Sequence, residues 1–78
     1  MLANIRVFSD PPRQVLINYR DFEVTGPDQA RDLAFSLIQK TPNALTALFD
    51  VREHHDPSYR SGFVSRSGNT LRGPEFSF

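Results

Sequence analysis

The fold is decided by the stretch Thr25–Lys40, which reads TGPDQARDLAFSLIQK. Apolar residues recur in it at the i, i+3, i+4, i+7 and i+8 spacing that places them on one face of an α-helix. Thr25 followed by Asp28 is the T-x-x-D form of a capping box, and Pro27 suits the first helical turn. Lys40 puts a positive charge where it stabilises a helix C-terminus. We therefore predict one amphipathic helix, whose buried face is formed by Ala30, Leu33, Ala34, Leu37 and Ile38.

Two strands are predicted before this helix. Residues 3–8 alternate apolar and polar side chains, as a half-buried strand does. The Asp10–Pro12 segment then reverses the chain, because proline fixes φ and lacks an N–H donor. A second strand begins near Val15, and its alternation slips at Arg20–Asp21. A bulge or tight bend there would return Phe22 to the core face.

The segment after the helix is predicted to add strands. Residues 44–53 alternate in the manner of a strand with one buried face, although their apolar residues also fit a helical stripe, so a second helix is the alternative. Residues 60–66 form a shorter predicted strand. The Ser67–Asn69 segment has the chemistry of a turn, and Thr70–Leu71 would return as the arm of a hairpin.

These elements predict an α+β fold, in which an antiparallel sheet of three to four strands is covered on one face by the helix at residues 26–40. The order is strand–strand–helix–strand (ββαβ), with a C-terminal hairpin as an option. A single domain would span residues 1–73, and residues 74–78 would form a C-terminal tail. A core this small leaves little room for an enclosed active-site cavity.

Composition restricts the function further. The chain has 78 residues, zero formal net charge and no cysteine. Zero net charge argues against binding that relies on bulk electrostatic attraction to nucleic acid. Without cysteine, disulfide and thiolate–zinc sites are excluded. No apolar run approaches the ~20 residues that a membrane span needs. We expect a cytoplasmic protein that does not interact with membranes.

Catalytic and metal-binding patterns are weak. The two histidines, His54 and His55, are adjacent, and no serine lies in a nucleophile-elbow motif. Neighbouring residues of an extended segment point to opposite sides, so these histidines and Asp56 do not form a convincing metal site. We expect no catalytic residues, no metal and no cofactor, whereas a pH-dependent contact through the histidines stays open.

Arginine and aromatic residues gather in the C-terminal third of the chain. Such a mixture on a sheet surface is how proteins grip single-stranded nucleic acid, because rings stack on bases and guanidinium groups meet phosphates. Arg60 and Arg66 are six positions apart, and this even spacing places them on one face of a strand. Arg72 continues the series, and Tyr59 and Phe63 are interleaved with it.

Protein–protein interaction is the leading interpretation. Arginine supplies eight of the nine basic residues, and it suits interfaces better than lysine does. Phe35 lies away from the centre of the apolar helix face, beside Arg31, so it is either the edge of the core or an exposed anchor. Phe76 and Phe78 of the tail pose the same question. The open edges of a small sheet could also pair with a second copy, which makes the protein a monomer or an edge-strand homodimer.

The strand–strand–helix–strand plan, the small size and the lack of catalytic or metal-binding residues resemble phage-encoded inhibitors such as anti-CRISPR proteins. This likeness is one of size and architecture, and toxin–antitoxin components and small regulators share it. We expect a non-enzymatic inhibitor or adaptor, encoded by a phage or mobile element, that binds a protein or ribonucleoprotein complex. The alternative is a module that binds single-stranded nucleic acid. The partner-binding residues that we predict are Arg31, Phe35, Tyr59, Arg60, Arg66 and Arg72.

Overall fold

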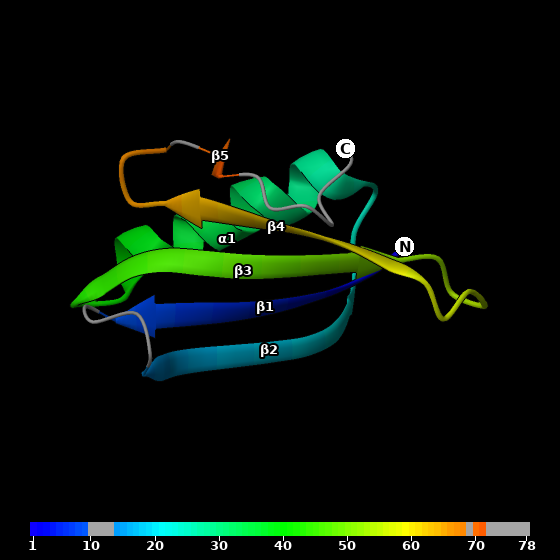
Figure 1. Cartoon of the computed structure of the whole chain (residues 1–78), viewed down its shortest axis with the longest axis horizontal. Coiled ribbons are helices and arrows are strands. Elements are labelled where there is room, and N and C mark those ends of the chain that lie inside the picture. Colours follow the sequence, from blue (N-terminus) through cyan, green and yellow to red (C-terminus); the bar gives the residue numbers. More distant parts are fainter. Residues whose placement is uncertain (10–13, 69, 72–78) are drawn as a thin grey trace.

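The computed structural model describes residues 1–9 and 14–68 and the backbone of residues 70–71. Within these residues, one helix packs on a five-stranded antiparallel sheet, with the strand order β2-β1-β3-β4-β5 (Figure 1). The α+β class that the sequence predicts is therefore confirmed. In chain order the elements are β1 (Leu2–Ser9), β2 (Val15–Glu23), α1 (Pro27–Lys40), β3 (Ala44–Arg52), β4 (Tyr59–Ser65) and β5 (Thr70–Leu71).

The segment that could have been strand or helix is β3, a central strand of the sheet. It pairs antiparallel with β1 along one side and with β4 along the other. Ala47, Phe49 and Val51 are buried, while the residues between them are only partly buried. This period of two is what a strand with one covered face requires. The hairpin that was left as an option also forms, because β5 pairs with β4.

The predicted phase slip in the second strand is a β-bulge. Ile5 of β1 lies opposite Tyr19, and Ala3 lies opposite Phe22, so β2 contains one more residue than β1 in this interval. Asp21 absorbs the irregularity with a φ of 54°, in the left-handed region that aspartate tolerates better than most residues. The bulge returns Phe22 to the helix-facing side, where it packs against the core.

The helix N-terminus differs from the prediction. Gly26 is the N-cap residue, and among the described residues no side chain caps the helix, so the predicted capping box from Thr25 to Asp28 is wrong. Instead, the backbone N–H of Thr25 donates to Oε1 of Gln29 at 2.6 Å. The reason is that Pro27 occupies the first turn, where its missing N–H is best tolerated. The helix therefore starts too late for Thr25 to act as its cap.

The buried helix stripe is narrower than predicted. Ala30, Ala34 and Ile38 are fully buried, and Leu37 packs against the core while remaining partly exposed. Leu33 is 37% exposed, so its assignment to the buried face is wrong. The two alanines have small side chains, which let the helix axis approach the sheet closely. At that rotation Leu33 lies on the flank of the helix.

The core lies between α1 and the centre of the sheet. α1 packs mainly on β3, with further contacts to β1 and β4, whereas β2 lies outside this main packing (Figure 1). Burial of apolar surface here is the chief stabilising term for so small a domain. The core residues are Ala3, Ile5, Val7, Val24, Ala30, Ala34, Ile38, Ala44, Ala47, Phe49, Val51 and Val64.

Some predictions lie outside the described residues. They are the reversal at residues 10–13, Arg72, and the tail at 74–78 with Phe76 and Phe78. Among the residues that the structure does describe, no helix is both long enough and apolar enough to cross a bilayer.

Candidate functional site

The two predicted helix residues lie on one flank of α1. The guanidinium group of Arg31 is 3.4 Å from Oδ1 of Asp32 and 3.8 Å from Oδ1 of Asp28, so this arginine makes ion pairs within its own helix. Phe35 is partly buried, packs against the core and lies beside Gly68 in the turn after β4. The question left open by the sequence is answered for Phe35, whose ring forms the edge of the core.

Arg66 is held at the C-terminal end of α1. Its Nε donates to the carbonyl of Ala44 at 2.7 Å, and its Nη2 donates to the carbonyls of Ile38 at 2.9 Å and Thr41 at 3.1 Å. The last carbonyls of a helix lack partners within it, and a cation there also interacts favourably with the helix dipole. Arg66 therefore fastens the helix end to the start of β3.

The other two predicted residues of β4 lie on opposite faces of the sheet. Arg60 is opposite Val51, a buried residue of the helix-facing side, so Arg60 and Arg66 share that side as their spacing predicts. Tyr59 is opposite Arg52 and is 64% exposed on the other side. Arg60 and Arg66 thus lie on the helix-facing side, whereas Tyr59 and Phe63, which the sequence groups with them, lie on the other side.

The surface of the sheet that faces away from α1 is here called the open face. It follows from the alternation of the strands, because residues between the buried positions of β1, β3 and β4 point away from the helix. Three adjoining hollows, with volumes of about 340, 290 and 380 Å³, lie on it. The open face comprises Leu2, Asn4, Arg6, Asn18, Arg20, Asp21, Leu48, Asp50, Arg52, Pro57, Tyr59, Ser61 and Phe63.

Asp50 lies at the centre of the open face and borders all three hollows. Its Oδ2 is 3.4 Å from Nη2 of Arg6, on the neighbouring strand β1. On the other side, the hydroxyl of Ser61 donates a hydrogen bond to Oδ1 of Asp50. Ser61 is only 5% exposed, so water has little access to this hydrogen bond. The Asp50 carboxylate is therefore fixed by groups on both adjacent strands.

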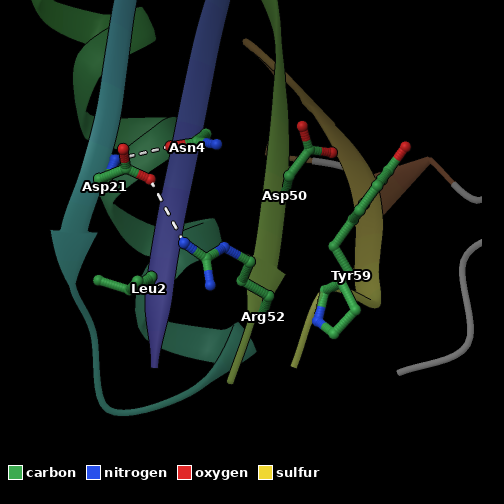
Figure 2. A pocket seen from close by; sticks show the side chains of 7 residues that line it. Leu2, Asn4, Asp21, Asp50, Arg52 and Tyr59 are labelled. Carbon is green, nitrogen blue, oxygen red and sulfur yellow. Dashed lines mark hydrogen bonds and ion pairs between the residues drawn. The ribbon is translucent and has the colours of Figure 1, made fainter. Parts of the chain in front are cut away.

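A second polar cluster forms at the bulge of β2, and Figure 2 shows its geometry. The backbone N–H of Asp21, which the bulge removes from the regular strand ladder, donates to Oδ1 of Asn4 at 2.6 Å. Arg52 extends from β3 across β1, and its Nη2 is 3.8 Å from Oδ1 of Asp21 (Figure 2). Arg52 also donates to the carbonyls of Glu53 and His54. This network ties three strands together at one end of the open face.

Arg20 differs from the other arginines of this surface. Its side chain is exposed and lines the hollow that also contains Arg6 and Asn18. Arg6 and Arg52 each face a carboxylate, whereas Arg20 makes no ion pair within the described part of the chain. Within the described residues, the open face therefore combines paired charges with the guanidinium group of Arg20, which has no ion-pair partner among them.

The partner-binding residues predicted from the sequence do not include Arg6, Arg20, Arg52 or Asp50. A signal for three of them was present, because the alternation in residues 3–8 and 44–53 places Arg6, Asp50 and Arg52 opposite the apolar face. The prediction followed the density of arginines in the C-terminal third instead. Arg6 is more than 40 residues from Asp50 and Arg52 in the sequence. These residues come together because β1 and β3 are neighbours in the folded sheet.

The histidine loop makes its contact at one end of the sheet. Nε2 of His54 is 2.6 Å from Oε1 of Glu23, and the Met1 amino group is 3.6 Å from Oε2 of the same residue. The hydrogen bond from His54 lowers the pKa of Glu23 below its ordinary 4.5, and the positive charges of His54 and Met1 act in the same direction. No group of three potential ligands in the described ranges could hold a metal ion.

We predict that Arg66→Ala destabilises the fold by about 2 kcal/mol, because three hydrogen bonds from a charged donor to backbone carbonyls are lost. Urea unfolding followed by circular dichroism measures the loss. Arg60→Ala is the matched control, and its exposed position predicts a change within about 0.5 kcal/mol. Equal effects of the two substitutions would contradict the clamping role of Arg66.

We predict that Glu23→Gln lowers the thermal midpoint near neutral pH and has progressively less effect in acid. A carboxyl group with a lowered pKa in the folded state adds stability above its unfolded pKa, and this stability is lost as the pH falls through the folded pKa. Thermal unfolding of both proteins between neutral and acid pH measures the difference. Glu53→Gln, on the adjacent loop, serves as the control, and an identical pH profile for the two variants would refute the prediction.

Comparison with protein-family models, curated protein sequences and solved structures finds no match to this chain. The functional interpretation therefore depends on the geometry and charge of the open face.

Proposed function

We propose that this chain is a non-enzymatic binding protein, whose open face contacts a protein partner. The observation that carries the proposal is the set of three adjoining hollows around Asp50. Volumes of 290 to 380 Å³ are at the low end for small-molecule pockets. Hollows of this size on an uncovered sheet suit individual side chains of a partner.

Aromatic and arginine side chains supply the anchors for such a contact. Tyr59 is 64% exposed and borders two of the hollows, and Phe63 lines one of these with Leu48. Tyrosine and arginine are enriched among the residues that dominate binding energy in protein interfaces. Arg20 lies on the opposite edge strand, so aromatic contacts and a free positive charge are available at the two sides of one surface.

The balance of charge favours a protein over a nucleic acid. Asp50 faces Arg6, and Asp21 faces Arg52, so carboxylates neutralise two of the guanidinium groups on the open face. The same carboxylates would repel a phosphate backbone. The Arg52–Asp21 pair is exposed. Exposed ion pairs contribute little to stability, so exchanging this pair for a charged group of a partner costs little. A surface with both signs of charge is suited to a partner that also carries both.

We propose further that the chain acts as an inhibitor or adaptor in the cytoplasm, because its size and its arrangement of elements are typical of such proteins. An origin in a phage or mobile element is part of this proposal. In support of a non-enzymatic role, the carboxylates of the open face are occupied by arginine or serine partners. His54 is bound to Glu23 at the end of the sheet. The Asp21 and Asp50 carboxylates and the His54 imidazole are therefore each engaged within the fold.

Affinity capture from a lysate of the native host tests the surface directly. We predict that Arg20→Glu reduces recovery of the captured protein at least about tenfold, because a positive group that meets the partner becomes negative. Arg31→Glu is the matched control, since it makes the same charge change on the helix. Quantitative mass spectrometry of the captured protein measures both effects.

If the contact is on the helix, the effects of the two substitutions on recovery of the partner are reversed. Loss of the partner with Arg31→Glu and full retention with Arg20→Glu would move the contact to the helix and contradict the proposal. Circular dichroism of both variants establishes that they are folded before capture.

Binding of single-stranded nucleic acid is the second candidate, and one observation favours it. Tyr59 and Phe63 share the open face with Arg6 and Arg20, which is the combination that stacks on bases and meets phosphates. This candidate predicts binding of a mixed-sequence single-stranded oligonucleotide that weakens steeply with rising salt. Fluorescence anisotropy measures it, and an absence of binding at low salt would eliminate it.

A further inference from the structure

β2 is an edge strand whose apolar side chains are incompletely covered. Tyr19 lies opposite Ile5, and Ile17 lies opposite Val7. Because Ile5 and Val7 are buried beneath α1, both β2 residues point to the helix-facing side of the sheet. Tyr19 is nevertheless 45% exposed, since α1 packs mainly over β3 and its neighbours and leaves β2 clear (Figure 1).

The flank of α1 nearest to β2 is also apolar. Successive helix residues are separated by about 100°, so Leu33 and Phe35 lie on opposite flanks of the buried stripe at Ala34. Phe35 lies beside Gly68, in the turn after β4, which fixes its flank on the β4 side. Leu33 therefore lies on the flank toward β1 and β2, as Leu37 does one turn later. Leu33 is 37% exposed there.

The outer edge of β2 has a segment without two of the features that usually block strand pairing, charge and proline. The residues from Val15 to Tyr19 include no charge and no proline, and charge and proline are the common devices by which edge strands avoid pairing. One bulge of β2 lies within this segment at Leu16, and the other lies just beyond it at Arg20–Asp21, where the register with β1 shifts. Between them Ile17, Asn18 and Tyr19 pair regularly with β1.

We propose that β2 pairs antiparallel with β2 of a second copy, about a two-fold axis at Asn18. In this register Ile17 lies opposite Tyr19 of the second copy, and the reciprocal pair forms on the other side of the axis. The two Asn18 amides face each other, and each can both donate and accept a hydrogen bond. The Leu33 flanks of the two helices face the axis on the same side of the joined sheet.

Registers whose axis lies closer to Arg20 than Asn18 does are disfavoured by charge and by the bulge. An axis at Arg20 would place two guanidinium groups opposite each other, and like charges in that position are destabilising. An axis at Tyr19 would place Ile17 opposite Asp21, next to the bulge. The axis at Asn18 instead places Arg20 opposite the uncharged Leu16. Since residues facing each other across antiparallel strands share a side, both helices lie on one side of the joined sheet and both open faces on the other.

This inference does not depend on the proposed function, because its apolar contact uses the edge and the helix-facing side of β2; of the residues it uses, Asn18 also borders the open face. Sedimentation velocity over a wide range of concentrations tests it with the full chain alone. Wild type should shift from the monomer mass to twice that mass as concentration rises. Tyr19→Lys should weaken the dimer at least about tenfold, because it places a charge within the apolar contact. Tyr59→Lys is the matched control on the open face, and it should dimerise as wild type does.

A second variant keeps the test decisive if Tyr19→Lys fails to fold. Asn18→Asp should weaken the dimer by placing two carboxylates together at the axis, and added salt should restore much of the association because it screens their repulsion. Asn43→Asp, at an exposed turn, should have no effect. Wild type that stays monomeric at every concentration would overturn the inference, as would equal weakening by Tyr19→Lys and Tyr59→Lys or by the two aspartate variants.

Discussion

The close packing of one helix on the centre of one sheet face is the constraint on which the rest of the structure depends. Ala30 and Ala34 present small side chains to the sheet, and Ile38 completes the buried stripe. The helix has 14 residues and is about 21 Å long. It packs on β3, β1 and β4, so it covers the central strands, and it lies on one side of the sheet. Among the described residues, no element covers the other face of the sheet. The open face and the β2 flank of the helix-facing side therefore remain exposed.

Arginine has different roles on the two sides of this sheet. On the helix-facing side, Arg66 donates to the carbonyls of Ile38 in the last turn of α1, of Thr41 and of Ala44, and so joins the helix end to β3. On the open face, Arg52 pairs with Asp21 at the surface, where such a pair adds little to stability, and Arg6 pairs with the mostly buried Asp50. Arg20 has no such pairing in the described structure. Residues of one type thus hold the core together on one side and remain available for recognition on the other.

The extent of sequence prediction follows from what periodicity can and cannot encode. Alternation predicts the strands, and the slip at Arg20–Asp21 predicts the bulge that β2 contains there. Periodicity does not encode how closely a helix approaches a sheet, and for that reason Leu33 was assigned to the core. It also does not encode which distant segments become neighbours. Arg66 was therefore predicted as a binding residue although its three hydrogen bonds are internal, and Arg6, Asp50 and Arg52 were missed because β1 and β3 meet only on folding.

The central claim is that the sheet is covered on one side and exposed for recognition on the other. Nuclear magnetic resonance with a dissolved paramagnetic agent measures this most directly, because the agent broadens signals from groups that solvent reaches. The account predicts strong broadening of the Tyr59 ring and of the Arg20 Nε–H signal, with sharp methyl signals from Ala34 and Ile38. Sharp signals from Tyr59 and Arg20, together with broadened methyl signals from Ala34 and Ile38, would contradict it.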